Sequence, residues 1–190
     1  YPVNPKGGIT EGLQAYTSIL EVPGEVDLAI IVVNAKFVLS TIDQCHEKGI
    51  KGICIITAGF KETGKEGAEL EKQLVEKLKE YGMRCVGPNC LGVVNTHPDI
   101  RMDGCFAESL PERGNIGFVS QSGALGGGIL NILKDLNLGF AQFISIGNQA
   151  DVNAETALEY WENDADVEQI LLYMESIQNP SNFRRLASRI

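Results

Sequence analysis

The sequence has no cluster of lysine and arginine, and this absence excludes two classes of partner. Its 190 residues include 16 Lys and Arg against 25 Asp and Glu, which gives a formal net charge of −9 at pH 7. Nucleic acids and anionic membrane surfaces both attract proteins through a basic patch. We therefore expect neither nucleic acid nor a membrane among the partners.

Long apolar runs are also absent. The longest, Ala29 to Val33 and Ile53 to Ile56, are far shorter than the roughly 18 to 20 residues that span a bilayer. The first residues, Tyr1 to Gly8, have neither the basic nor the apolar region of a secretory signal. Five cysteines without a CxxC pair indicate reduced thiols and a cytoplasmic location. Because the chain opens without a methionine, we expect it to be a portion of a longer protein.

Groups for several kinds of catalysis are scarce. Only two histidines are present, His46 and His97, and neither has a partner at a spacing typical of a metal site or of a catalytic triad. His46 falls on a predicted helix, where an exposed structural role is the simpler interpretation. The GxGxxG pattern of a dinucleotide site and the GxSxG pattern of a nucleophile elbow do not occur. The sequence therefore gives little support to a metalloenzyme, a serine hydrolase or an NAD-binding domain.

What the chain does have is an alternating pattern of segments that is typical of the α/β class. Hydrophobic residues make up 44% of the sequence, which is enough for a sizeable core. Apolar, β-branched runs alternate with amphipathic stretches, the pattern of βα units that build a mostly parallel sheet. Six strands are predicted: Leu28 to Val33, Gly52 to Thr57, Met83 to Val86, Asn115 to Ser120, Ala141 to Ile146 and Glu168 to Met174.

Helices are predicted between these strands. Apolar spacing predicts one helix over Lys36 to Lys48 and another over Lys65 to Tyr81, each followed directly by a glycine that suits a C-terminal cap. Further helices are expected from Ser122 and from about Pro180 to the last residue.

The segment from His97 to Gly114 has little periodicity and two prolines, Pro98 and Pro111, so we interpret it as a linker. It divides the chain into two α/β modules, residues 1–112 and residues 113–190, each of which we expect to be incomplete.

Ligands of open α/β sheets bind where strands end, so the turn after Ser120 is a first candidate site. It continues as Gln121-Ser122-Gly123-Ala124-Leu125, and three further glycines follow. Unpaired amides at a helix start, with hydroxyls and small residues nearby, suit a phosphoryl group. The alternative is that Ser122 only caps the helix and the glycines allow close packing against the sheet.

Other turns offer single functional groups. Asn89, in the turn Gly87-Pro88-Asn89-Cys90-Leu91-Gly92, presents an amide that suits a purine or a pantetheine. Cys90 is a candidate nucleophile, although without a paired histidine a structural role is the simpler interpretation. Glu175 ends an otherwise apolar strand, where a carboxylate is costly unless it is solvated or has a histidine or cation as partner.

Five segments stand out when the turns are read in order along the chain. They are Asn4-Pro5-Lys6-Gly7-Gly8, Gly87-Pro88-Asn89-Cys90, Val119-Ser120-Gln121-Ser122-Gly123-Ala124-Leu125, Ser145-Ile146-Gly147-Asn148-Gln149-Ala150-Asp151 and Tyr173-Met174-Glu175-Ser176-Ile177. Taken together, they resemble the NDP-forming acyl-CoA synthetases, the superfamily of succinyl-CoA synthetase and ADP-forming acetyl-CoA synthetase. The resemblance covers essentially the whole chain, and the sequences of these segments are more similar to the second enzyme.

The resemblance implies a Rossmann-like domain that binds coenzyme A, followed by a flavodoxin-like ligase domain. It implies that acyl-CoA, phosphate and NDP are converted into acid, CoA and NTP through an acyl phosphate and a phosphohistidine. Magnesium-bound NDP or NTP is then expected on an ATP-grasp nucleotide-binding domain or subunit outside this chain, in an oligomeric enzyme.

The resemblance also implies roles for individual residues. Ser122 and Gly123 would hold the phosphate or phosphohistidine, and Glu175 would orient the catalytic histidine. The rest of the phosphate loop would comprise Ser120, Ala124, Gly147 and Asn148. CoA would contact Pro5, Lys6, Val33, Asn34, Ala35, Thr57, Ala58, Gly59 and Asn89.

Departures from the family pattern leave a second hypothesis open. The family's first strand and glycine-rich CoA turn would precede Tyr1, and its catalytic histidine would follow Ile190. Ala58 stands where succinyl-CoA synthetase has a glutamate. The alternative is a regulatory module that senses CoA or acyl-CoA, as in protein acetyltransferases fused to this region, without ligase activity.

Overall fold

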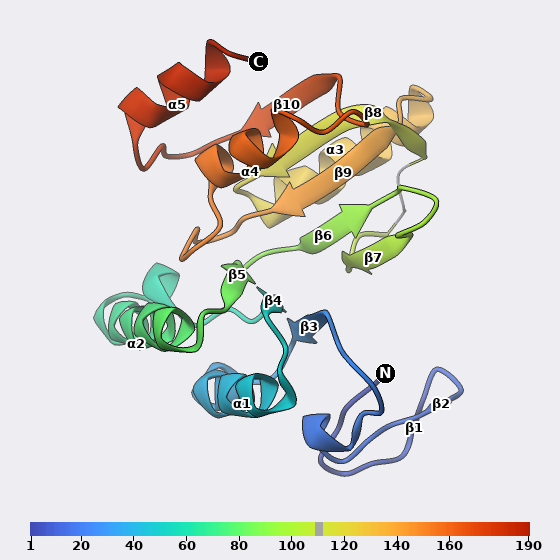
Figure 1. The fold of residues 1–190 in the computed structure, drawn as a ribbon, viewed down its shortest axis with the longest axis vertical. Coiled ribbons are helices and arrows are strands. Elements are labelled where there is room, and N and C mark those ends of the chain that lie inside the picture. The colour runs from blue at the N-terminus through green and yellow to red at the C-terminus, as the bar shows by residue number, and fades with distance from the viewer. Residues whose placement is uncertain (109–111) are drawn as a thin grey trace.

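The computed structural model describes residues 1–108 and 112–190, which form two main sheets with flanking helices (Figure 1). The expected α/β class is confirmed, and all six predicted strands are present within three residues of their expected bounds. Among the described residues, no helix is long and apolar enough to cross a membrane.

The first sheet has three parallel strands in the order β3-β4-β5. These are β3 (Leu28–Ile31), β4 (Gly52–Ile55) and β5 (Arg84–Val86). Helix α1 (Ala35–Lys48) links β3 to β4, and α2 (Lys65–Tyr81) links β4 to β5. Their apolar faces pack on the sheet in one core that includes Ile42, Ile53 and Leu74, all buried.

Both helices end as predicted. Gly49 and Gly82 follow them with φ of 87° and 61°, the left-handed conformation that glycine adopts without steric cost. Short elements complete this half of the molecule: the hairpin β1 (Ile9–Thr10) and β2 (Leu13–Gln14), and the 3₁₀ helices η1 (Ile19–Glu21) and η2 (Lys61–Thr63).

The second sheet has five strands in the order β10-β8-β9-β6-β7. These are β6 (Gly92–Asn95), β7 (Met102–Cys105), β8 (Arg113–Ser120), β9 (Phe140–Ser145) and β10 (Gln169–Tyr173). Strands β10, β8 and β9 are parallel, whereas β6 and β7 are antiparallel to their neighbours. The helices are α3 (Gly123–Asp135), α4 (Ala154–Trp161) and α5 (Pro180–Ala187).

The interpretation of residues 97–114 as a linker is wrong in part. Strand β7 lies inside this segment and pairs with β6, so the second sheet begins at Gly92, before the expected division at residue 112. The sequence of β7, Met-Asp-Gly-Cys, carries no apolar alternation, and the strand lies at the edge of the sheet, paired only with β6. Pro111, part of the linker argument, lies outside the described residues.

Candidate functional site

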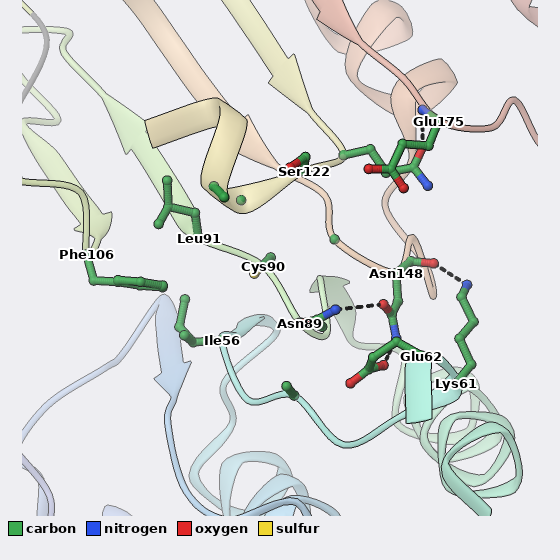
Figure 2. A pocket seen from close by; sticks show the side chains of 15 residues that line it. Ile56, Lys61, Glu62, Asn89, Cys90, Leu91, Phe106, Ser122, Asn148 and Glu175 are labelled. Atoms are coloured by element: carbon green, nitrogen blue, oxygen red, sulfur yellow. Dashed lines mark hydrogen bonds between the residues drawn. The ribbon is translucent and has the colours of Figure 1, made fainter. Parts of the chain in front are cut away.

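A cleft of about 770 Å³ lies where strands of both sheets end (Figure 2). Its walls come from the residues after β4, β5, β8, β9 and β10, and from the segment after β7. The lining residues are Ile56, Ala58, Lys61, Glu62, Asn89, Cys90, Leu91, Phe106, Gln121, Ser122, Gly123, Ala124, Gly147, Asn148 and Glu175. The carboxyl ends of two different sheets therefore share one cavity.

The N-terminus of α3 opens into this cleft. Ser122 is its N-cap, and the Oγ of Ser122 accepts a hydrogen bond from the amide of Leu125 at 3.3 Å. The amides of Gly123 and Ala124 precede that capped amide and have no carbonyl partner within the helix, because the first amides of any helix lack one. This end of α3 thus presents amide donors and the positive end of the helix dipole to the cleft.

The glycines of α3 also have the packing role that the alternative interpretation assigned to them. A Cβ on Gly126 would lie 3.1 Å from Cβ of Ser120 and 3.1 Å from Cζ of Phe143. Ser120 is fully buried, and its hydroxyl donates to the carbonyl of Ser122 at 2.6 Å. Ser120 therefore supports the turn from beneath and does not line the cleft.

The strand ends of the first sheet form a continuous edge. The Oγ1 of Thr57 donates to the carbonyl of Val33 at 2.7 Å, and the amide of Asn89 donates to the carbonyl of Thr57 at 3.0 Å. A Cβ on Gly59 would lie 3.0 Å from Cβ of Ala35, so these two turns touch. Asn34 caps α1, because its Oδ1 accepts from the amide of Lys36.

The structure brings about half of the predicted site residues into the cleft. Those that line it are Ala58, Asn89, Ser122, Gly123, Ala124, Gly147, Asn148 and Glu175. Those outside its lining are Pro5, Lys6, Val33, Asn34, Ala35, Thr57, Gly59 and Ser120. Pro5 and Lys6 belong to the exposed N-terminal segment, where the amide of Lys6 donates to Oδ1 of Asn4.

Glu175 is exposed at the rim of the cleft, and its backbone is held by a residue that the sequence analysis left without a role. The Oε1 of Gln121 accepts from the amides of Glu175 and Ser176, at 2.9 and 3.0 Å. The amide of Gln121 donates to the carbonyl of Tyr173. Gln121 therefore joins the phosphate-loop candidate to the turn that carries Glu175.

Lys61, Glu62 and Glu71 were also missed. Lys61 and Glu62 lie on η2 and line the cleft. The carboxylates of Glu62 and Glu71 each accept a hydrogen bond from Nδ2 of Asn148, at 2.6 Å and 2.8 Å. Desolvation raises the pKa of Glu62, but hydrogen bonds from Asn148 and from the amides of Gly59 and Phe60 outweigh it and lower the pKa overall. The only signal in the sequence was the position of this charged pair just after a strand end.

The segment Gly147 to Asp151 joins the two sheets through its backbone. The amides of Asn148, Ala150 and Val152 donate to the carbonyls of Pro88, Gly87 and Cys85, at 2.9, 3.1 and 3.0 Å. The carboxylate of Asp151 accepts from the amide of Cys85 and from Nε of Arg84. A Cβ on Gly147 would lie 2.3 Å from the carbonyl oxygen of Pro88, so only glycine allows this approach.

Cys90 lies in the cleft wall with its thiol engaged. Its Sγ donates to the carbonyl of Ile55 at 3.2 Å and lies 3.8 Å from Sγ of Cys54. The contact with Cys90 and burial raise the pKa of the Cys54 thiol far above its usual range. No histidine lines the cleft in the part of the chain that the structure describes, so Cys90 has no histidine beside it to act as its base.

The same described ranges contain no group of three or more His, Cys, Asp or Glu side chains that could hold a metal ion.

Comparison with known proteins matches both halves of the chain. Residues 1–96 match the family model of a CoA binding domain, and residues 113–190 match that of a succinyl-CoA ligase like flavodoxin domain. The chain is 47% identical over 190 residues to the Pyrococcus furiosus acetate–CoA ligase [ADP-forming] II subunit alpha. It spans 41% of the length of that subunit.

Solved structures agree with these matches. A crystal structure of a Pyrococcus horikoshii protein superimposes with a TM-score of 0.94 at 46% identity, covering all of this chain and 43% of that one. The Ca. Korarchaeum cryptofilum dinucleotide forming acetyl-coenzyme A synthetase 1, solved in complex with phosphate and ADP, gives 0.92 at 37% identity and 40% coverage of its own chain.

Proposed function

Since the chain belongs to the NDP-forming acyl-CoA synthetases, with a CoA binding domain followed by a succinyl-CoA ligase like domain, we propose that it supplies the CoA and phosphate sites of an acid–thiol ligase. The enzyme interconverts acyl-CoA, phosphate and NDP with acid, CoA and NTP. The observation that carries this proposal is the cleft, in which the N-terminus of α3 faces the strand ends of the first sheet.

This arrangement suits a reaction in which phosphate attacks a thioester. The amides of Gly123 and Ala124 would hold the phosphate, and the strand ends would hold CoA with its thioester in the cleft. Attack of a phosphate oxygen on the acyl carbon forms an acyl phosphate and releases CoA. The helix N-terminus would stabilise the negative charge on the phosphoryl group in that step.

The residue roles follow from these positions. We assign the CoA edge to Val33, Asn34, Ala35, Thr57, Ala58, Gly59 and Asn89, with Pro5 and Lys6 along the CoA phosphates. Ser122 fixes the helix start, and Glu175, held by Gln121, would orient the histidine that takes the phosphoryl group from the acyl phosphate. That histidine, together with the ATP-grasp unit that binds magnesium and NDP, would lie outside these residues in a cytoplasmic oligomer.

Replacement of Ser122 tests whether phosphate and CoA occupy separate sites. In the complete protein that carries this chain, Ser122→Phe should fill the helix start and abolish phosphate-dependent release of CoA from acetyl-CoA. Binding of CoA, measured by calorimetry, should change less than about twofold because its contacts lie on the first sheet. An equal loss of phosphate-dependent CoA release and of CoA binding would refute the assignment of two separate sites.

The histidine is tested separately. The coding region beyond Ile190 should supply a histidine in a glycine-rich loop, and incubation with ATP should give an acid-labile phosphoryl group on it. If the protein binds acyl-CoA tightly but is never phosphorylated, the alternative of a CoA-sensing module without ligase activity becomes the better account.

A further inference from the structure

Four polar side chains of the cleft lining, Lys61, Glu62, Asn89 and Asn148, form a connected group with Glu71, which is buried behind them. The roles assigned above use only two of these five residues. We call Lys61, Glu62, Glu71, Asn89 and Asn148 the Asn148 cluster. Asn148, 8% exposed, stands at its centre (Figure 2). Its Nδ2 donates to Glu62 and Glu71, its Oδ1 accepts from Nδ2 of Asn89 at 3.3 Å, and its carbonyl accepts from the ammonium of Lys61.

The chemistry of the cluster requires an amide at position 148. Both Nδ2 protons go to carboxylates, and Lys61 is the cation beside them, with its Nζ 3.1 Å from Oε1 of Glu71. An aspartate of the same shape would remove both donors and set a third carboxylate against the other two. Asn148 therefore cannot be exchanged for its isostere without repulsion across the cleft.

The cluster reaches both binding regions. Glu62 accepts from the amides of Gly59 and Phe60, and so fixes the turn that contains Ala58. On the other side, Asn148 follows Gly147 at the end of β9, and the amide of Ile146 donates to the carbonyl of Ser120 at 2.9 Å, just before the phosphate site. A polar connection thus runs from the CoA edge to the start of α3.

We propose that Asn148 and Glu62 are positioning residues, which set the separation between the CoA thiol and the acyl phosphate; this inference rests on the proposed function. In the ligase direction the CoA sulfur attacks the acyl carbon, a C–S bond forms, the bond from that carbon to the phosphate oxygen breaks, and the departing phosphate takes the thiol proton. Reacting atoms must approach to about 3–3.5 Å, and an error of about 1 Å costs on the order of 100-fold in rate. Phosphorylation by NTP does not involve CoA and does not depend on this separation.

The test compares two reactions in the complete enzyme. Asn148→Asp should lower kcat for acetyl phosphate plus CoA by roughly 10- to 100-fold, and it should lower phosphorylation by ATP without CoA by a much smaller factor. Asn148→Asp combined with Glu62→Gln should recover part of the loss, because the new amide donates to the new carboxylate. Gln73→Glu is the control: it adds the same charge at an exposed site on α2 and should change neither reaction.

Either of two results overturns the inference: no change in the CoA reaction, or equal loss of both reactions in a folded variant. If Asn148→Asp does not fold, Glu62→Gln alone applies the test, with a one-sided loss of about tenfold or more expected for one hydrogen bond to a charged carboxylate. A parent enzyme inactive in both reactions refutes the proposed function and this inference together. A parent active in both, with unaffected variants, refutes this inference alone.

Discussion

Gly147→Ala should be among the most damaging small substitutions in this protein. Gly147 has φ of +51°, and an added Cβ would lie 2.3 Å from the carbonyl oxygen of Pro88 and 2.4 Å from that of Asn89. Both are backbone atoms, so no side chain can rotate away. The segment that begins at Gly147 would have to move away from the first sheet.

The cost can be estimated from its parts. The left-handed conformation costs an L-residue roughly 1–2 kcal/mol. Displacement breaks at least the bond from the Asn148 amide to Pro88 and at most also those of Ala150 and Val152, each about 1 kcal/mol. The expected loss in free energy of unfolding is therefore about 2–5 kcal/mol.

Urea unfolding followed by the fluorescence of Trp161, which is buried in the second sheet's core, measures this loss. Gly24→Ala is the matched control, because Gly24 has φ of +72° with no atom within 4 Å of an added Cβ. It should lose only the roughly 1–2 kcal/mol of conformational strain. Equal losses in the two variants would refute the argument from close approach.

Three further predictions follow from the described contacts. Ser122→Ala should lower the free energy of unfolding by about 1 kcal/mol through loss of the α3 cap, measured by urea titration. The pKa of Glu62 in the folded protein lies below its usual 4.5, so ionised Glu62 stabilises the fold above pH 4.5. This stabilisation is lost as the pH falls through the pKa of the folded state. Glu62→Gln should therefore flatten the acid limb of a Tm–pH profile. In native protein at pH 8, iodoacetamide should label half-buried Cys105 before Cys45, because burial raises the pKa of the Cys45 thiol to about 11. Peptide mass spectrometry measures the two labelling rates, and faster labelling of Cys45 would contradict this.

The regular part of the fold was predictable because its signals are local. The helix over Lys65 to Tyr81 carries its apolar face and its terminal glycine in consecutive residues, and its bounds were predicted without error. The strand at Met102 was missed because its own four residues have no periodicity, and β6, the adjacent strand with which it pairs, was not predicted either.

Site residues that directly follow a strand could be predicted from the sequence. Those whose role depends on contact with a residue far away in the chain could not. Ser122 and Glu175 follow strands, so their position alone marked them. Glu71 lies within α2, where its charge resembles that of any solvated helix face, and only the fold reveals that it is buried against Asn148. Gln121 is a similar case, since its role depends on a turn more than fifty residues away.

The early start of the second sheet has a practical consequence for anyone who divides the gene. A cut near residue 112 leaves β6 and β7 attached to the first half and strips β9 of a neighbour, which exposes a strand edge in both products. A cut before Gly92 keeps each sheet whole, but it falls in the turn of Asn89 and Cys90, which is part of the cleft wall. Neither break preserves both the sheets and the cleft. In gene recombination and in fragment expression, the two modules should therefore be kept together.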